Sequence, residues 1–91
     1  MRQIVLDGAA VFSREELHEV LSRELSLPEW YGRNLDALFD CLSAELTEET
    51  GIRVRHPEVL QERLGGYGTV FLRVLREAEE ENPLLFVTLS E

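Results

Sequence analysis

The run Leu-Leu-Phe-Val-Thr-Leu at residues 84–89 decides the fold of this 91-residue chain. It is almost continuously apolar, which is typical of a strand covered on both faces, as in a parallel sheet. A segment with helical periodicity, residues 67–81, precedes it and ends at Asn82-Pro83. A buried strand that follows a helix predicts a β–α–β crossover and therefore parallel strands.

Two more strands are predicted upstream. Residues 3–7 (Gln-Ile-Val-Leu-Asp) form a short buried strand that ends at the turn signal Asp7-Gly8. Residues 52–55 (Ile-Arg-Val-Arg) alternate between apolar and basic side chains, which predicts a strand with one face in water. After the second of these strands, Pro57 opens a short helix that ends near Leu64.

Two helices are predicted between the first two strands. The first begins at Ser13, which has the capping-box spacing to Glu16, and Phe12 is placed to pack on Leu17 as a hydrophobic staple. The second covers residues 35–46 behind the N-cap Asn34. The chain is therefore predicted to be a single domain, residues 1–91, of the α/β class: a three-stranded parallel sheet packed by about four helices.

The chain is strongly acidic, which limits the classes of molecule that it is expected to bind. Nine arginines, with no lysine, face eighteen acidic residues, and the net charge is −9. Such a chain repels nucleic acid and anionic membranes and attracts a cationic partner. The single cysteine, Cys41, cannot form an internal disulfide and is predicted to be a core residue in a cytoplasmic protein.

The second helix carries the most suggestive polar pattern. Asp36 and Asp40 are four residues apart and share one face, with Phe39 beside them and Trp30 and Tyr31 in the preceding loop. Carboxylates of this kind can stand in for phosphates against arginine, lysine and protonated histidine. The alternative is a solvated helix face with core aromatics, and a second alternative is a divalent-metal enzyme that uses the two aspartates.

Other chemical signals are weak. His18 lies on the apolar stripe of the first helix, so a structural role is expected. The acidic run Glu79–Glu81 is expected to be solvated. Neither a phosphate-binding glycine loop nor a catalytic motif is present, so no enzymatic activity, cofactor or metal site is predicted.

Residues 25–42, Leu-Ser-Leu-Pro-Glu-Trp-Tyr-Gly-Arg-Asn-Leu-Asp-Ala-Leu-Phe-Asp-Cys-Leu, strongly resemble the barstar family of intracellular inhibitors of barnase-like secreted ribonucleases. The resemblance extends to Glu16-Leu17-His18, Leu75-Arg76-Glu77-Ala78 and Thr88-Leu89-Ser90. It implies the same three-stranded parallel sheet, and insertion of the second helix and its preceding loop into the ribonuclease active site.

Carried onto this chain, the resemblance implies that Asp40 is the principal anchor and that Asp36 meets a second basic residue of the enzyme. Trp30 would pack on the catalytic histidine, Phe39 would lie at the interface margin, and Glu77 would pair with a peripheral arginine. The full set of expected partner-binding residues is Trp30, Tyr31, Asn34, Asp36, Phe39, Asp40, Ala44 and Glu77.

Several positions depart from the family pattern: Arg33 stands where an acidic residue is usual, and Ala44 replaces a glycine. These departures concern the exact target more than the activity. The expected partner is a secreted guanyl-specific ribonuclease bound as a 1:1 heterodimer. The alternatives are an antitoxin or adaptor module of the same fold that binds a different cationic protein, and a plain structural subunit.

Overall fold

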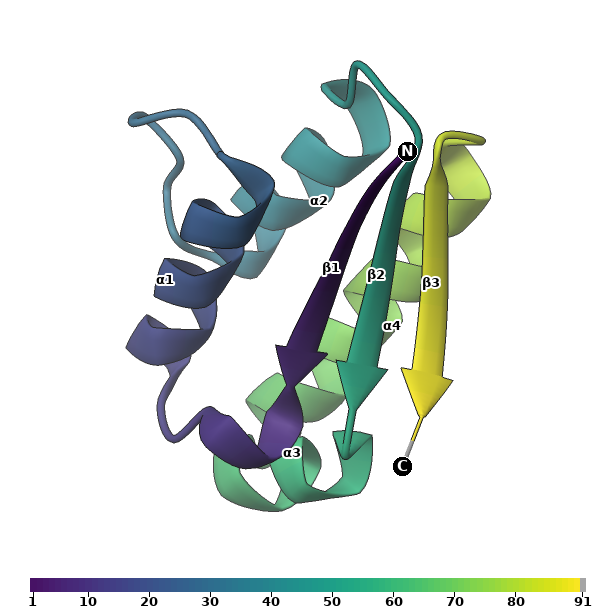
Figure 1. The fold of residues 1–91 in the computed structure, drawn as a ribbon. Helices are drawn as coiled ribbons and strands as arrows, with labels where there is room; N and C mark the ends of the chain where they lie inside the picture. Colours follow the sequence, from purple (N-terminus) through teal and green to yellow (C-terminus); the bar gives the residue numbers. More distant parts are fainter. Residues whose placement is uncertain (91) are drawn as a thin grey trace.

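The computed structural model describes residues 1–90 and contains one sheet and four α-helices (Figure 1). The strands are β1 (Arg2–Asp7), β2 (Thr50–Arg55) and β3 (Leu85–Ser90). The helices are α1 (Arg14–Leu25), α2 (Leu35–Ala44), α3 (Pro57–Leu64) and α4 (Gly66–Glu81), and a 3₁₀ helix covers Gly8–Ala10. The α/β class and the three-stranded parallel sheet with four helices are confirmed.

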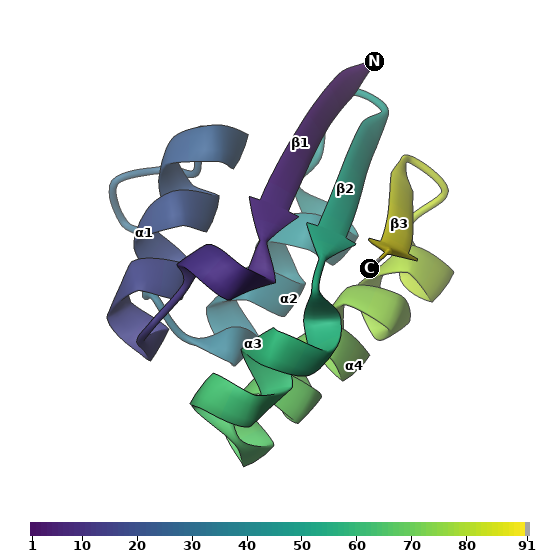
Figure 2. The ribbon, with the colours of Figure 1, turned by 60° about the horizontal axis from the view of Figure 1, so that its bottom comes forward.

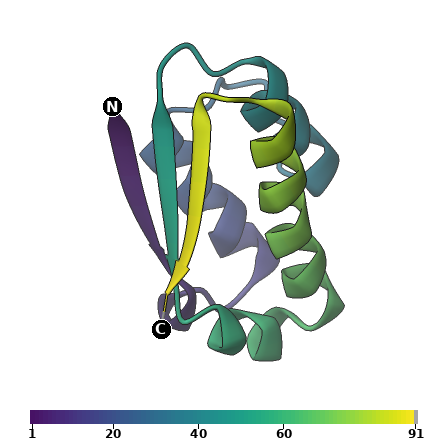
Figure 3. The same cartoon turned by 90° about the vertical axis from the view of Figure 1, so that its right-hand side faces the viewer.

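The strands are parallel and lie in chain order, β1-β2-β3. Ile4 pairs with Ile52, which pairs with Val87, and all three side chains point into the core. Figure 3 shows that α1, α2 and α4 lie on one side of the sheet. Figure 2, turned toward the lower end of the molecule, shows α3 closing the bottom of this layer beside the end of β2. Among residues 1–90, every helix is too short or too polar to span a bilayer.

The other face of the sheet is open, so the expectation that β3 is covered on both faces is wrong. Phe86 is 43% exposed and Val5 on β1 is 53% exposed, whereas Leu85 and Val87 on the inner face are buried. The reason is topological. Two right-handed crossovers that step in the same direction, from β1 to β2 and then to β3, place both sets of helices on the same side.

The two predicted helix starts are confirmed by their caps. The Ser13 hydroxyl accepts from the backbone N–H of Glu16 at 3.1 Å, and the Asn34 side chain accepts from Ala37 N–H at 2.7 Å. The staple is wrong, because Phe12 is 62% exposed.

The ring of Phe12 turns outward to stack with the Arg63 guanidinium, whose carbon lies 4.0 Å from the ring centroid. Arg63 also donates to the carbonyl of Ala9, which holds it over the ring. A cation–π contact therefore takes the place of the predicted apolar contact.

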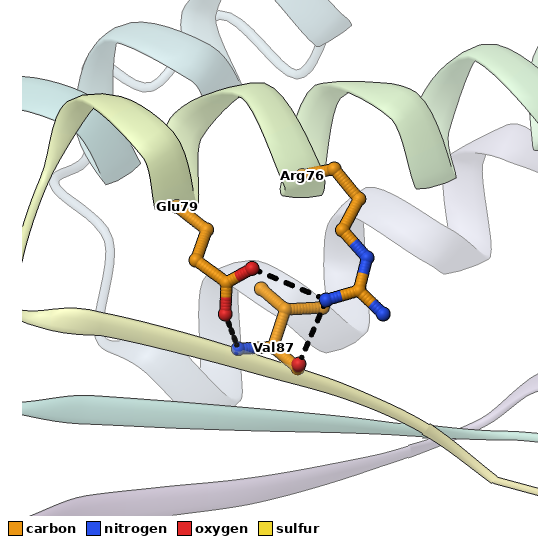
Figure 4. Close-up of polar contacts among 3 residues, drawn as sticks. All are labelled: Arg76, Glu79 and Val87. Atoms are coloured by element: carbon orange, nitrogen blue, oxygen red, sulfur yellow. Dashed lines mark hydrogen bonds and ion pairs between the residues drawn. The ribbon is translucent and has the colours of Figure 1, made fainter.

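The outer edge of β3 is held by two side chains of α4 (Figure 4). The Glu79 carboxylate accepts from Val87 N–H at 2.6 Å, and the Arg76 guanidinium donates to the Val87 carbonyl at 3.1 Å. Arg76 and Glu79 also form an ion pair at 3.1 Å. The expectation that Glu79 is merely solvated is therefore wrong, because its carboxylate accepts a hydrogen bond from the outer edge of β3.

Candidate protein-binding surface

Asp36 and Asp40 project from the solvent-exposed face of α2, as their spacing predicts. They border a groove of about 440 Å³ between α2 and α4. The apolar lining of the groove comes from Leu35, Phe39 and Val74. Its acidic lining comes from Asp36, Asp40, Glu77, Glu80 and Glu81. Four of the expected partner-binding residues, Asp36, Phe39, Asp40 and Glu77, are thus brought together here.

The carboxylates of the groove are available to a partner. The ion pairs found within residues 1–90 are Arg2–Glu48 and Arg76–Glu79, and neither includes a groove residue. Five acidic side chains around an apolar floor make a strongly negative concave surface, which attracts a cationic group and excludes an anionic one. In the described part of the chain, no three His, Cys, Asp or Glu side chains converge to hold a metal ion, so nothing here favours the metal-enzyme alternative.

The position of α2 against α4 is set partly by the buried amide of Asn82, which the sequence indicates only as the end of a helix. Asn82, at the end of α4, donates from Nδ2 to the Leu42 carbonyl at 2.9 Å and accepts from Leu84 N–H at 2.9 Å. It is 7% exposed. Since Leu42 lies in the last turns of α2, this side chain fixes the two walls of the groove relative to one another.

The loop before α2 sends its two neighbouring aromatic rings in opposite directions. Trp30 is 69% exposed and lies outside the groove, on the surface. Tyr31 is only 6% exposed, and its hydroxyl lies 2.5 Å from Nδ1 of His18. Tyr31 is therefore a core residue in this structure and offers little of its surface to a partner. An apolar ring with a polar tip finds both an apolar environment and a hydrogen-bond partner in the core.

Asn34 and Ala44 mark the two ends of α2, and both are exposed. The Asn34 side chain is already engaged: its oxygen caps α2, and its nitrogen donates to the Gly32 carbonyl at 3.3 Å. Arg33, immediately before Asn34, adopts a left-handed conformation, with φ of 53°. None of these three residues lines the groove.

The predicted structural roles of His18 and Cys41 are confirmed. His18 is 2% exposed, and both ring nitrogens meet tyrosine hydroxyls: Tyr31 at 2.5 Å and Tyr67 at 2.6 Å. Burial and then the nearby charge of Arg33 lower the pKa of His18, so the ring is held neutral. Cys41 is 3% exposed, and burial raises the pKa of its thiol, with smaller contributions from neighbouring carboxylates.

Burial also raises the pKa of both tyrosines that bond His18, so Tyr31 and Tyr67 keep their phenol protons. For Tyr67 the nearby Arg14 guanidinium, 5.0 Å from the ring centroid, acts in the opposite direction. The His18 cluster is therefore a neutral hydrogen-bonded network with no charged member.

Four groove residues were not predicted: Leu35, Val74, Glu80 and Glu81. Helical spacing could have found those on α4, because residues 74, 77 and 81 follow one another at three and four positions along one face of that helix. What the sequence lacked was the information that this face of α4 lies beside α2.

Taken together, the fold and the groove define a class: small acidic α/β proteins with a groove in which exposed carboxylates lie beside an aromatic ring. More particularly, the chain belongs to the barstar family. The family described as "Barstar (barnase inhibitor)" matches residues 1–89. The chain is also similar to the protein named "Putative ribonuclease inhibitor YrdF" of Bacillus subtilis (strain 168). The two are 40% identical over 81 residues, which cover 89% of each chain.

Proposed function

We propose that this protein inhibits a secreted microbial ribonuclease by occupying its active site with α2 and the loop before it. The observation that carries the proposal is the pair of exposed, unpaired carboxylates of Asp36 and Asp40 at the edge of the acidic groove. Membership of the barstar family and the name of the B. subtilis relative support it.

The mechanism is competitive occlusion without chemistry. A ribonuclease holds the phosphates of RNA with cationic side chains, and carboxylate oxygens offer those side chains equivalent acceptors. Asp40 and Asp36 take the place of the phosphate oxygens, Trp30 packs on the catalytic histidine of the enzyme, and Phe39 excludes water beside the carboxylates. Glu77 adds a peripheral contact from α4 across the groove.

The partner we propose is a guanyl-specific ribonuclease, bound one to one in the cytoplasm of the cell that produces it, before export. The net charge of −9 suits this partner, because an enzyme that binds RNA presents a cationic cleft. Neither nucleic acid nor a membrane is a partner in this proposal.

The decisive experiment measures inhibition of two or three purified microbial ribonucleases in a fluorogenic RNA-cleavage assay. The test variant is Asp40→Asn, and the matched control is Glu19→Gln on the exposed side of α1. Both substitutions remove one negative charge, so their effect on net charge is the same. Asp40→Asn is expected to weaken inhibition by about 2 kcal/mol or more, roughly 30-fold, mainly through faster dissociation.

Glu19→Gln is expected to inhibit nearly as well as the unmodified protein. Equal inhibition by Asp40→Asn and the unmodified protein would refute the role of Asp40. If the unmodified protein inhibits none of the ribonucleases but captures a different cationic protein, the adaptor alternative replaces the proposal.

A further inference from the structure

His18 connects three separate parts of the fold through its two ring nitrogens. It lies on α1, its Nδ1 meets the hydroxyl of Tyr31 in the loop before α2, and its Nε2 meets the hydroxyl of Tyr67 in the first turn of α4. The ring centroid lies 5.7 Å from that of Tyr31 and 6.0 Å from that of Tyr67. No buried side-chain nitrogen or oxygen among residues 1–90 lacks a hydrogen-bond partner.

The neutral ring suits this arrangement. A neutral imidazole has one N–H donor and one acceptor nitrogen, so one tyrosine hydroxyl donates to the ring while the other accepts from it. Each hydroxyl therefore has a defined orientation. The network specifies where the Tyr31 oxygen lies, and with it where the backbone of residue 31 lies.

The loop that this contact restrains has no regular secondary structure. It runs from the end of α1 to the start of α2 and is bracketed by two left-handed residues, Ser26 with φ of 52° and Arg33 with φ of 53°. Between them the chain turns once, with Tyr31 N–H bonded to the Pro28 carbonyl at 2.9 Å. The side chain of Tyr31 is the group that ties the tip of this turn to the core.

Trp30 directly precedes Tyr31 in the chain. Tyr31 is buried and Trp30 is 69% exposed, so holding the first ring inward directs the second ring outward. We propose that the Tyr31–His18 hydrogen bond makes both residues positioning residues, which hold Trp30 in its partner-binding orientation before the partner arrives. This inference rests on the proposed function, because it assigns Trp30 to the interface.

The energetic logic is preorganisation. A loop that is already ordered loses less conformational freedom on binding than a mobile one, and the complex then dissociates more slowly. The Tyr31 hydroxyl can contribute in this way although it is buried in the core. The ring alone would fill the same space in the core, so the hydroxyl acts here through the hydrogen bond that it makes with His18.

The experiment uses the full chain, whose only tryptophan is Trp30 and therefore reports on this loop alone. The test variant is Tyr31→Phe, which removes the hydroxyl and keeps the ring. The matched control is Tyr67→Phe, which removes the other hydroxyl on the same imidazole but lies on α4. Tyr31→Phe is expected to lower the fluorescence anisotropy of Trp30 in the free protein, and Tyr67→Phe to leave it unchanged.

With an inhibited ribonuclease, Tyr31→Phe is expected to dissociate about 3- to 10-fold faster, the range that one hydrogen bond provides. Tyr67→Phe is expected to dissociate at the unmodified rate. Unchanged anisotropy and dissociation in Tyr31→Phe would overturn the inference, and so would equal changes in both variants, which would indicate general loosening of the core.

The two proposals fail separately. Anisotropy is measured without a partner, so it tests the tie between Tyr31 and His18 even if no ribonuclease is inhibited. Conversely, the unmodified protein could inhibit strongly while Tyr31→Phe changes neither the anisotropy nor the dissociation rate. That result would support the proposed function and refute the positioning role.

Discussion

At the scale of single residues, His18 shows how a polar side chain can serve a core. Its ring is buried, and its two nitrogens form hydrogen bonds with the hydroxyls of Tyr31 and Tyr67. The charged groups near it, Arg33 and Glu15, act in opposite directions on its pKa, and burial is the largest influence. The protonated ring is therefore the unfavourable form in the folded protein.

Stability is consequently expected to fall in mild acid. The pKa of His18 is lowered by folding from its ordinary value of 6.5, so between these two pKa values the unfolded chain binds more protons. The contribution of His18 to the free energy of unfolding is therefore complete above pH 6.5. It decreases as the pH falls from 6.5 toward the folded-state pKa. Urea unfolding at pH 7.5 and pH 5.5 measures the difference, above the range in which most carboxylates titrate.

The control for this pH effect is His18→Gln, which keeps a polar side chain at position 18 but does not titrate. Its unfolding free energy is expected to be lower at pH 7.5 but nearly flat between the two pH values. An equally steep decline in this variant would assign the pH dependence to other groups.

At the scale of elements, the backbone after β1 packs closely against the backbone after β2 at Gly8. A Cβ atom built on Gly8 would lie 2.6 Å from the His56 carbonyl oxygen and 2.7 Å from that of Arg55. Both neighbours are backbone atoms, which cannot rotate away as a side chain could. Only glycine therefore permits this approach of the 3₁₀ helix to the start of α3.

Gly8→Ala is accordingly expected to lower the free energy of unfolding by about 1 to 3 kcal/mol, the usual cost of overpacking. Gly66→Ala, at the first residue of α4, is the matched control, because a Cβ there has no neighbour within 4 Å. It is expected to be neutral or to stabilise by up to about 1 kcal/mol, through reduced freedom of the unfolded chain. Denaturant unfolding of both variants tests this, and equal destabilisation would contradict the packing argument.

At the scale of the whole molecule, the negative charge is unevenly distributed. The net charge is −9, and five carboxylates are gathered around the groove between α2 and α4. A field of this kind accelerates encounter with a cationic partner and contributes less once the two surfaces are in contact.

Association with the ribonuclease is therefore expected to slow steeply as salt is added, while dissociation changes little. Stopped-flow measurements from low salt to about 1 M, where the Debye length is about 3 Å, provide the test. Glu77→Gln is expected to lower the association rate modestly at low salt and to have no effect at high salt. An association rate that is independent of salt would refute electrostatic steering.

Much of this molecule was predictable from its sequence. Periodicity and breakers located the three strands and four helices, and the caps Ser13 and Asn34 lie where their side chains predicted. Spacing placed Asp36 and Asp40 on one exposed face. These features depend on short stretches of chain, so a local pattern contains the information that they need.

The features that were missed all depend on contacts between distant segments. The exposed Phe86 follows from strand order, the burial of Tyr31 from the position of His18, and the outward turn of Phe12 from Arg63. The amide of Asn82 marked the end of a helix in the sequence, yet in the fold it also bonds α2. No periodicity in a single segment reports on such partners.

The way α4 holds the outer edge of β3 has a consequence for the behaviour of the molecule in a crowded cell. An edge strand offers unpaired backbone groups on which a strand of another chain can assemble, and such growth leads to aggregates. At Val87 both groups are already occupied, by Glu79 and Arg76. Because these partners belong to the same chain, the middle of β3 is closed to foreign strands at any protein concentration, even before a partner is bound.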